Sequence, residues 1–288
     1  MTARALRIAT RGSPLALAQA ERVAAYLAAD AEIVVVKTEG DRRTDEPLRD
    51  MAGRGVFTTE VQVAVLDGRA DLAVHSAKDL PASASLQVEG LVIAAVPERA
   101  DVRDCLVGST LDGLAPGATV GTGSPRRQAL LEHLRPDLNF VGLRGNIATR
   151  LARVGELAAI VGAVAALTRL GLADQISEAF DPSTFVPQVG QGALAVECRV
   201  DDAATLDRVA AIDDSEAHRA LLAERAFLAT LGGGCDAPVG AYARVDGGEL
   251  SLVGFMVTDF GPQWATDTGG DPRALGEAVA NAVRGGRA

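Results

Sequence analysis

The chain contains almost no lysine. Of its 28 basic side chains only Lys37 and Lys78 are lysines, and 38 acidic residues bring the formal net charge to −10. A net acidic chain without a basic stretch is unlike a general nucleic-acid binder, so we expect no nucleic-acid partner. The chain is also rich in Ala, Gly and Asp, as a GC-rich genome would encode, and the same bias explains much of the excess of arginine over lysine. The two lysines are therefore the more informative basic residues.

Cysteines are also few. Cys105, Cys198 and Cys235 are odd in number and far apart, so the sequence indicates neither a disulfide framework nor a Cys-x-x-Cys site, and we expect no metal. No apolar run reaches the roughly 18 residues of a membrane span. No sustained apolar run follows the N-terminus, so a secretory signal is not expected. These features favour a cytoplasmic protein without a membrane partner.

Apolar runs of strand length alternate with longer helical patterns as far as residue 161. Strands are expected at 6–10, 33–37, 72–75, 91–96, 119–121, 139–141 and 158–161, and helices at 14–29, 58–66, 125–134 and 147–154. This alternation predicts an α/β fold. Beyond residue 213 the pattern changes to a long helix (215–231), a hairpin (239–245 and 249–258) around Asp246-Gly247-Gly248 and a closing helix (272–283), which predicts a small α+β domain.

Two of the expected helices begin in the same way, with Ser-Pro after a strand and a glycine turn. Ser13 and Ser124 are suited to cap these helices. Two ordinary capped helices are one interpretation. Arg11, Arg126 and Arg127 favour another, because cations at a helix N-terminus oppose the helix dipole and an external anion would offset that conflict.

More arginines follow at Arg144 and Arg150, close to a third possible cap at Asn146. A solvated helix face would explain Arg150 and Arg153 equally well. The clustering of Arg126, Arg127, Arg144 and Arg150 favours a polycarboxylate or polyphosphate ligand, because arginine holds such groups in bidentate geometry. The chain has neither a GxxxxGK[ST] nor a GxGxxG pattern, which disfavours a nucleotide.

The strand expected at 72–75 ends in a polar cluster that contains Lys78 and Asp79. Open α/β sheets bind ligands beyond the carboxyl ends of their strands. Asp79 could therefore stabilise a developing cation or move a proton, or it could form only a surface ion pair with Lys78. His75 is interpreted as a satisfied strand histidine and not as a ligand. A metal is not indicated, because no second His or Cys lies at metal-ligand spacing.

Cys235 stands on a glycine-rich loop, Leu231-Gly232-Gly233-Gly234-Cys235-Asp236-Ala237-Pro238. An isolated cysteine is usually a small core residue. Three neighbouring glycines leave a thiol open to a larger partner, which favours a reactive cysteine here.

Six ordered motifs identify a resemblance that covers nearly the whole chain. They are Arg7-Ile8-Ala9-Thr10-Arg11 with Ser13-Pro14-Leu15-Ala16-Leu17; Ala73-Val74-His75-Ser76 with Lys78-Asp79; Gly121-Thr122 with Ser124 and Arg126-Arg127-Gln128; Leu143-Arg144-Gly145-Asn146; Val189-Gly190-Gln191-Gly192-Ala193; and Gly233-Gly234-Cys235. Together they resemble the porphobilinogen deaminase (hydroxymethylbilane synthase) family.

The resemblance implies a transferase of tetrapyrrole biosynthesis. Members of the family carry a dipyrromethane cofactor on the cysteine that matches Cys235. They add four porphobilinogen units to it, each with loss of ammonia, and then hydrolyse off hydroxymethylbilane. Asp79 matches the catalytic aspartate. The matching positions for the cofactor are Lys78, Thr122, Ser124, Arg126, Arg127, Arg144 and Gly145, and those for the substrate are Arg11, Ser13, Gln19, Arg144 and Arg150.

The resemblance also implies a fold and a domain organisation. Two α/β domains similar to type II periplasmic binding proteins would comprise residues 1–97 with 189–213 and residues 98–188. A C-terminal α+β domain (214–288) would present the cysteine. Relatives of this kind lead us to expect a monomer.

The sequence departs from the family pattern in a few places. Arg54 stands where many relatives carry lysine, and Thr58 and Thr59 stand where a second lysine is common. Pro125 replaces a more usual leucine and Gly123 a serine. These changes affect the loop at 48–60 and the second helix start, and leave the catalytic assignment unchanged.

Two other functions fit parts of the pattern. A two-lobed binding protein for small anions would use the same helix ends but needs no reactive cysteine. A different cysteine enzyme would use Cys235 as its nucleophile and would need a base nearby, for which His218, far upstream on the preceding helix, is a poor candidate.

Overall fold

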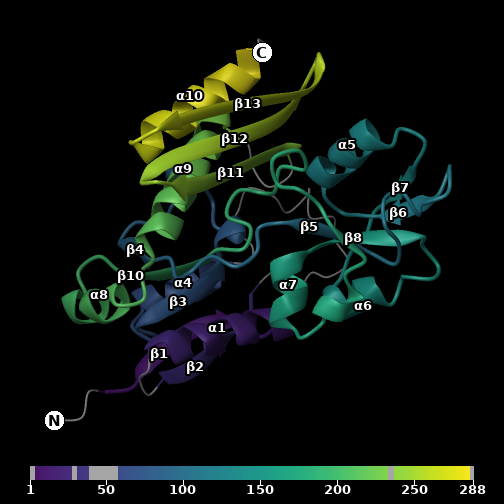
Figure 1. The fold of residues 1–288 in the computed structure, drawn as a ribbon. Helices are drawn as coiled ribbons and strands as arrows, with labels where there is room; N and C mark the ends of the chain where they lie inside the picture. The colour runs from purple at the N-terminus through teal and green to yellow at the C-terminus, as the bar shows by residue number, and fades with distance from the viewer. Residues whose placement is uncertain (1–3, 28–30, 39–57, 233–236, 286–288) are drawn as a thin grey trace.

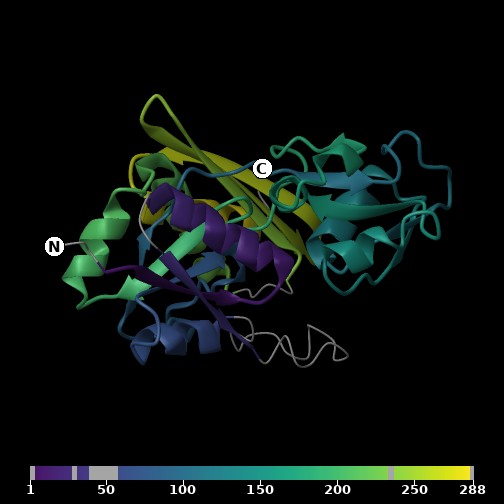
Figure 2. The same cartoon turned by 90° about the horizontal axis from the view of Figure 1, so that it is seen from below.

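A computed structural model describes residues 4–27, 31–38, 58–232 and 237–285. Figure 1 shows two α/β units and a third unit, formed by the C-terminal helices and strands, that lies against both. The same arrangement is seen from below in Figure 2. Among the described residues, no helix combines the length and the apolar character of a membrane span.

The first sheet has the strand order β2-β1-β3-β10-β4. Its strands are β1 (Leu6–Arg11), β2 (Ala31–Val36), β3 (Leu72–Ser76), β4 (Leu91–Ala95) and β10 (Leu194–Arg199). β1 pairs in parallel with β2 and β3, whereas β10 runs antiparallel between β3 and β4. Helices α1 (Pro14–Leu27), α4 (Thr59–Leu66) and α8 (Ala203–Ala210) belong to this unit, and 3₁₀ helices η1 (Ala77–Asp79) and η2 (Ala84–Leu86) follow β3.

The second sheet repeats this design in the order β7-β6-β8-β5-β9. Its strands are β5 (Asp104–Val107), β6 (Thr119–Gly121), β7 (Asn139–Val141), β8 (Ala159–Ala163) and β9 (Glu178–Ala179), and its helices are α5 (Pro125–Leu134), α6 (Ile147–Leu151), α7 (Val164–Arg169) and η3 (Ala173–Gln175). In both sheets three parallel strands stand in the order second, first, third, and an antiparallel strand pairs with the third. That antiparallel strand, β10 or β5, follows a segment in which the chain crosses between the units.

The C-terminal unit is a three-stranded antiparallel sheet with two helices. Strands β11 (Val239–Asp246), β12 (Glu249–Thr258) and β13 (Gly261–Gly269) form the sheet, and α9 (Ser215–Leu231) and α10 (Pro272–Gly285) pack on it. Phe227, Leu252 and Val279 lie in the core between sheet and helices. Phe255 lies in a second cluster with Leu106 of β5, so the sheet also packs against the second α/β unit.

The expected fold class is confirmed, with two α/β units and a C-terminal α+β unit. Several elements differ from the prediction. The helix expected at 147–154 ends at Leu151, and β13 adds a third strand to the predicted hairpin. The strand patterns at β5 and β9 and the helices α7 and α8 had not been predicted.

Candidate functional site

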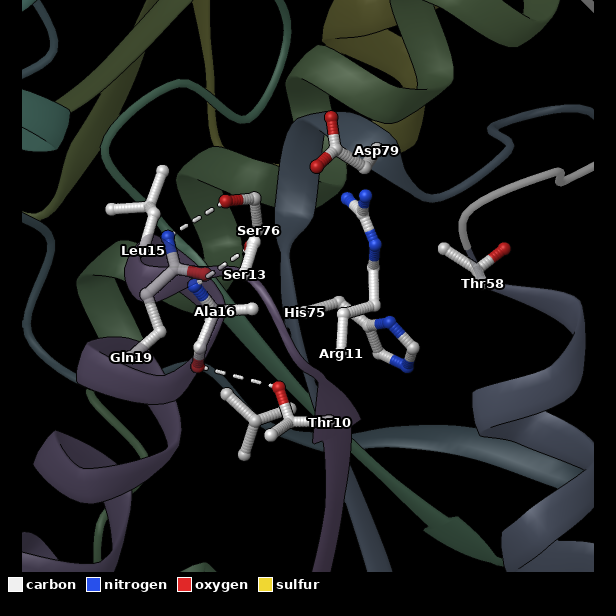
Figure 3. Close-up of a pocket in the computed structure, with 11 residues that line it drawn as sticks. Thr10, Arg11, Ser13, Leu15, Ala16, Gln19, Thr58, His75, Ser76 and Asp79 are labelled. Atoms are coloured by element: carbon white, nitrogen blue, oxygen red, sulfur yellow. Dashed lines mark hydrogen bonds between the residues drawn. The ribbon is translucent and has the colours of Figure 1, made fainter. Parts of the chain in front are cut away.

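A pocket lies at the carboxyl ends of β1 and β3 in the first unit (Figure 3). Arg11 ends β1, Ser13 precedes α1, and Asp79 closes η1 directly after β3. In Figure 3 the Arg11 guanidinium extends toward the Asp79 carboxylate. The pocket is lined by Thr10, Arg11, Ser13, Leu15, Ala16, Gln19, Thr58, Val74, His75, Ser76 and Asp79. The structure thus brings together four of the predicted site residues, namely Arg11, Ser13, Gln19 and Asp79.

Two hydrogen bonds order the inner wall of this pocket. Ser13 Oγ accepts from the backbone N–H of Ala16 over 3.3 Å, as expected for a helix cap. Gln19 is buried on α1, and its Nε2 donates to Ser76 Oγ over 2.8 Å. Asp79 is exposed at the rim, where its carboxylate is accessible to a ligand.

His75 forms part of the buried floor beneath Arg11. Its Nε2 lies 3.1 Å from Glu197 Oε2, and Gln62 Nε2 donates to the same oxygen over 2.9 Å. These contacts outweigh burial and hold the pKa of Glu197 below its ordinary value, although burial alone would raise it. His75 is thus a buried strand residue, as expected, but its Nε2 has no hydrogen-bond partner by geometry in the described part of the chain, so the expectation that it is satisfied is not confirmed.

The second α/β unit presents a helix start as the sequence predicted. Ser124 caps α5, and its Oγ accepts from the backbone N–H of Arg127 over 3.4 Å with Pro125 in the first turn. Thr122 is buried, and its Oγ1 accepts from the Ser124 N–H over 3.2 Å. A Cβ at Gly123 would lie 2.7 Å from the Leu143 carbonyl oxygen, so a side chain at 123 would require that carbonyl to move.

Arg126 and Arg127 are buried and share one carboxylate. Arg127 donates from Nε and a terminal nitrogen to Asp104 Oδ1 over 2.9 and 2.7 Å, and Arg126 lies 2.7 Å from Asp104 Oδ2. The two guanidiniums hold the pKa of Asp104 down to about 2 although burial would raise it. The anion that offsets these arginines is thus internal, and two cations on one carboxylate leave a surplus positive charge.

Arg144, Gly145 and Arg150 lie beside this pair. Gly145 has φ +92°, and its carbonyl accepts from Arg150 Nε over 2.8 Å. The pKa of Arg150 is lowered by burial and by the charges of Arg127 and Arg144. Arg153, in contrast, pairs with exposed Glu156 over 2.6 Å, so the solvated-face interpretation holds for Arg153.

Lys78 interacts electrostatically with Asp79 at the pocket rim and with the arginines of α5. Its pKa falls to about 8, because burial and the positive charges of Arg127 and Arg126 outweigh Asp79 and Asp104, which raise it. Lys78 therefore senses both the Asp79 rim and the arginines of α5. The charge of Asp79 is one of the two that raise this pKa, so an ion pair between Lys78 and Asp79 remains an alternative interpretation.

Cys235 lies outside the described residues, as does most of the loop at 48–60. The described flanks of Cys235 are α9, which ends at Leu231 and is capped by Gly232 with φ +65°, and β11. Gly240 on β11 packs so closely that an added Cβ would lie 2.9 Å from Arg126 Cδ. Ala241 N–H donates to the Pro187 carbonyl over 3.0 Å. The strand that follows the cysteine loop thus contacts the arginine cluster.

Sequence reasoning missed the residues that hold the arginines. Asp104 is fully buried at the start of β5, and Gln191 Nε2 donates to its Oδ1 over 3.0 Å. The available signal was an acidic residue directly before the apolar run Cys105-Leu106-Val107. A charge next to a buried strand needs a partner, and two consecutive arginines were present in the chain.

These geometries define the chemistry that the site can support. The site holds more positive charges than the single internal carboxylate of Asp104 can neutralise; they belong to Lys78, Arg126 and Arg127, with Arg144 and Arg150 beside them. This surplus suits a ligand with several carboxylates. Asp79 offers one exposed carboxylate at the edge of that positive region. An anionic ligand that becomes cationic at one atom would be stabilised by both parts of the site.

Comparison with known proteins agrees with this chemistry. A family model described as "Porphobilinogen deaminase, dipyromethane cofactor binding domain" matches residues 6–207, and "Porphobilinogen deaminase, C-terminal domain" matches residues 218–284. A porphobilinogen deaminase from Acidothermus cellulolyticus is 46% identical, over 96% of this chain and 87% of its own. Similar relatives come from Roseiflexus sp. (45%, over 98% and 97%) and Pelobacter propionicus (41%, over 100% and 97%).

Proposed function

The chain belongs to the porphobilinogen deaminase family, and from that premise we propose which of its residues carry the reaction. It is a transferase that joins four porphobilinogen molecules, with release of ammonia, to a dipyrromethane primer and hydrolyses off hydroxymethylbilane. The observation that carries the assignment of residues is the surplus of buried positive charge around Asp104, beside an exposed Asp79.

The residues present fit the dipyrromethane cofactor, since each of its pyrroles bears an acetate and a propionate. The negative charge of Asp104 does not neutralise the positive charges of Lys78, Arg126 and Arg127. Arg144 adds an exposed cation nearby. We propose that these side chains, with Thr122, Ser124 and Gly145, hold the cofactor carboxylates and that Cys235 bonds it covalently. When bound, the cofactor supplies the attachment point for the growing chain.

Asp79 is proposed as the catalytic residue. Loss of ammonia from porphobilinogen leaves positive charge on the pyrrole, and a carboxylate at that point lowers the energy of the charged species. Asp79 is accessible at the pocket rim, and η1 fixes it directly after buried β3. Its Oδ atoms can also accept the proton that the coupled pyrrole loses.

The pocket residues are proposed to orient the substrate. Arg11 and Arg150 supply cations for its acetate and propionate groups, and Arg144 serves either ligand. Ser13 and Gln19 line the same pocket, and Gln19 also bonds Ser76 at the end of β3, directly before the turn that carries Asp79. This arrangement supports binding of an anionic monomer beside the anionic cofactor.

We also propose the organisation and setting of the protein. Residues 1–97 with 189–213, residues 98–188 and residues 214–288 would form its three domains. The repeated sheet design and the separate C-terminal sheet support this division. The small number of cysteines supports a cytoplasmic protein, and the net charge of −10 supports one without a nucleic-acid partner. No described helix is long and apolar enough for a membrane partner to be proposed, and the family resemblance leads us to propose a monomer.

The decisive experiment measures intact mass and turnover of the purified chain. The mass should exceed that of the sequence by two porphobilinogen units less two ammonia, and acid treatment should reveal dipyrromethane colour. The protein should release ammonia from porphobilinogen. A chain of bare mass that binds porphobilinogen without turnover would instead identify a two-lobed anion-binding protein.

A further inference from the structure

Asp104 is a fully buried carboxylate next to the site, and the proposed function assigns it no part in binding or catalysis. It opens β5, directly after the chain has crossed from the first α/β unit to the second. Its side chain is 0% exposed. Oδ1 accepts two hydrogen bonds from Arg127, and Oδ2 forms an ion pair with Arg126 over 2.7 Å without a hydrogen-bond partner in the described part of the chain. The paired hydrogen bonds restrict the direction in which the Arg127 guanidinium can point, and the ion pair holds the Arg126 guanidinium beside it.

The remaining contacts of the two arginines complete this restriction. Arg126 also donates to the Val186 carbonyl over 2.7 Å, and Arg127 to the Val161 carbonyl over 3.1 Å. A guanidinium carries more N–H groups than these contacts use, so donors remain for a ligand. Without Asp104, two buried cations would stand side by side at the N-terminus of α5, where the helix dipole also opposes them.

Gln191 connects Asp104 to the segment that packs against the turn bearing Lys78 and Asp79. It is 1% exposed, and its Nε2 donates to Asp104 Oδ1 over 3.0 Å and to the Val102 carbonyl over 2.8 Å. Its Oε1 is buried without a hydrogen-bond partner in the described part of the chain. The orientation of this amide therefore depends on what Nε2 reaches, and Asp104 is one of its two acceptors.

The backbone around Gln191 touches the turn that carries Lys78 and Asp79. Gly190 has φ +74°, and a Cβ there would lie 2.9 Å from the Lys78 backbone nitrogen. Ala77 N–H donates to the Ala193 carbonyl over 3.1 Å. The segment 190–193 is thus bonded to Asp104 through Gln191 and packed directly against the catalytic turn.

We propose that Asp104 is a positioning residue, which acts with Gln191 to fix Arg126 and Arg127 relative to the turn that bears Lys78 and Asp79. The inference rests on the proposed function, because it assumes that these arginines hold cofactor or substrate carboxylates. Asp104 touches neither ligand. It sets where the cationic donors stand when the ligand carboxylates arrive, and it keeps one negative charge among three cations so that they can be buried together.

Asp104→Asn tests this inference, because it keeps the shape and removes the charge. Purified Asp104→Asn should carry cofactor in only part of the molecules by intact mass. In the loaded fraction, the KM for porphobilinogen should rise by about tenfold to a hundredfold, since displaced binding groups have effects of that size. The kcat should change less than the KM, because Asp79 is unaltered.

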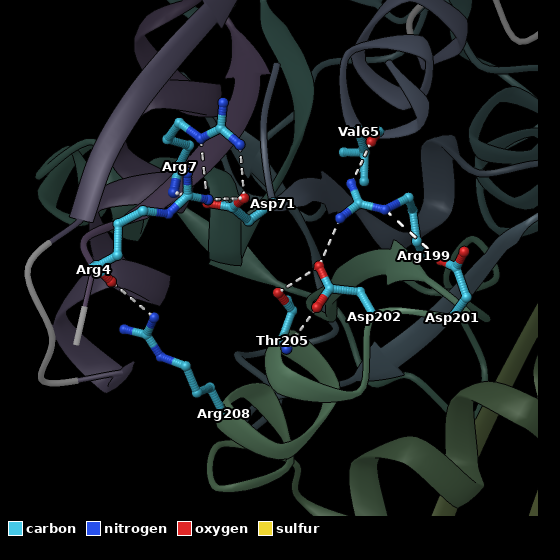
Figure 4. A network of polar contacts seen from close by, with 9 residues as sticks. All are labelled: Arg4, Arg7, Val65, Asp71, Arg199, Asp201, Asp202, Thr205 and Arg208. Carbon is cyan, nitrogen blue, oxygen red and sulfur yellow. Dashed lines mark hydrogen bonds and ion pairs between the residues drawn. The ribbon is translucent and has the colours of Figure 1, made fainter. Parts of the chain in front are cut away.

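Asp71→Asn is the matched control. Asp71 is also a buried carboxylate between two arginines, with Arg4 and Arg7 donating over 2.6 and 2.8 Å (Figure 4). It precedes β3, whereas the site lies at the opposite end of that strand. A general loss of stability would affect both variants alike. The positioning role requires that Asp71→Asn keeps full cofactor mass and the wild-type KM.

Gln191→Met decides the matter if Asp104→Asn does not fold. It preserves the side-chain volume and the charge balance and removes only the hydrogen bonds to Asp104 and Val102. Its KM should rise severalfold with an unchanged kcat. The inference is overturned if a folded Asp104→Asn, or Gln191→Met in its place, matches the wild type in cofactor mass and KM. A wild-type chain of bare mass without turnover would instead refute the proposed function.

Discussion

Gln19 donates a hydrogen bond from Nε2 to Ser76 Oγ over 2.8 Å and thereby joins α1 to the end of β3. Both residues line the pocket, and Gln19 is buried. Ser76 is the last residue of β3, directly before the 3₁₀ turn that carries Lys78 and Asp79. The bond therefore fixes the turn that carries Asp79 against the helix that Ser13 caps.

Gln19→Leu should reduce both stability and turnover. Loss of this buried bond should lower the free energy of unfolding by about 1 kcal/mol. The kcat should also fall, because the turn that carries Asp79 is no longer held against α1 by this hydrogen bond. Urea unfolding and initial rates would measure the two effects. Gln128→Leu is the control, since Gln128 Nε2 bonds exposed Glu132 over 2.8 Å on the outer side of α5. Equal effects of the two variants would contradict a positioning role for Gln19.

Asp79→Asn should separate catalysis from folding. Asp79 is exposed, so its replacement should change the free energy of unfolding by no more than about 0.5 kcal/mol. Turnover should fall by at least about a hundredfold, because the amide cannot stabilise the cation left by ammonia. Asp79→Glu should keep part of the activity, since the charge survives though displaced. Single-turnover mass spectra should show every pyrrole addition slowed. Unchanged turnover of Asp79→Asn would leave Asp79 with a surface role only.

The cysteines should divide into one modified and two inert thiols. Cys105 and Cys198 are fully buried, and burial raises their thiol pKa values to about 12 and about 11. Neither should react with iodoacetamide in the native protein near neutral pH, because the thiolate is the reactive form. Cys105→Ala and Cys198→Ala should keep the cofactor mass, whereas Cys235→Ser should have the mass of the bare chain. An adduct that survives in Cys235→Ser would move the attachment site to another residue.

Local signals in the sequence were sufficient for the elements that position the site. Ser124-Pro125 indicated the start of α5, and Asp246-Gly247-Gly248 indicated the turn between β11 and β12, because caps and tight turns depend on neighbouring residues. The helix expected at 147–154 was too long. The chain already turns after Leu151, and Gly155 takes φ +100°.

Long-range partners could not be predicted in the same way. Asp104 meets Arg127 across 23 residues of sequence and Gln191 across 87. These separations correspond to no helix or strand periodicity, so the sequence does not indicate the contacts. Only the tertiary fold shows that the carboxylate that neutralises part of the arginine charge belongs to the protein itself. β13 was missed because Gly261–Gly269 lacks apolar alternation and depends on pairing with β12. The family resemblance predicted which residues belong to the site, but it did not identify the residues that hold them in position.

Lys78 should make ligand affinity depend on pH. Burial and the adjacent arginines lower its pKa to about 8, so its positive charge is lost as the pH rises through that value. The KM for porphobilinogen should therefore increase above about pH 8, and Lys78→Met should remove this part of the pH profile. Stability should change in the opposite sense. Between about 8 and the ordinary lysine value of 10.5, the unfolded chain binds the proton more tightly, so folding stability from this group rises with pH. A KM profile identical in wild type and Lys78→Met would contradict this role.

Replacement of Arg144 by leucine should affect ligand binding alone, whereas replacement of Arg126 by leucine should affect both ligand binding and stability. Arg144 is exposed, so Arg144→Leu should unfold like the wild type while losing a charge-assisted ligand contact of about 1.5 to 3 kcal/mol. Arg126 is 2% exposed and engages both Asp104 and Val186, so Arg126→Leu should also lower the free energy of unfolding by about 3 to 5 kcal/mol. Arg126→Lys should recover part of that stability and little of the cofactor loading, because an ammonium cannot reproduce the planar fork. Thermal unfolding and intact mass on the same three preparations would test both points. Normal cofactor mass and turnover in Arg144→Leu would refute the assignment of Arg144 to the ligand carboxylates.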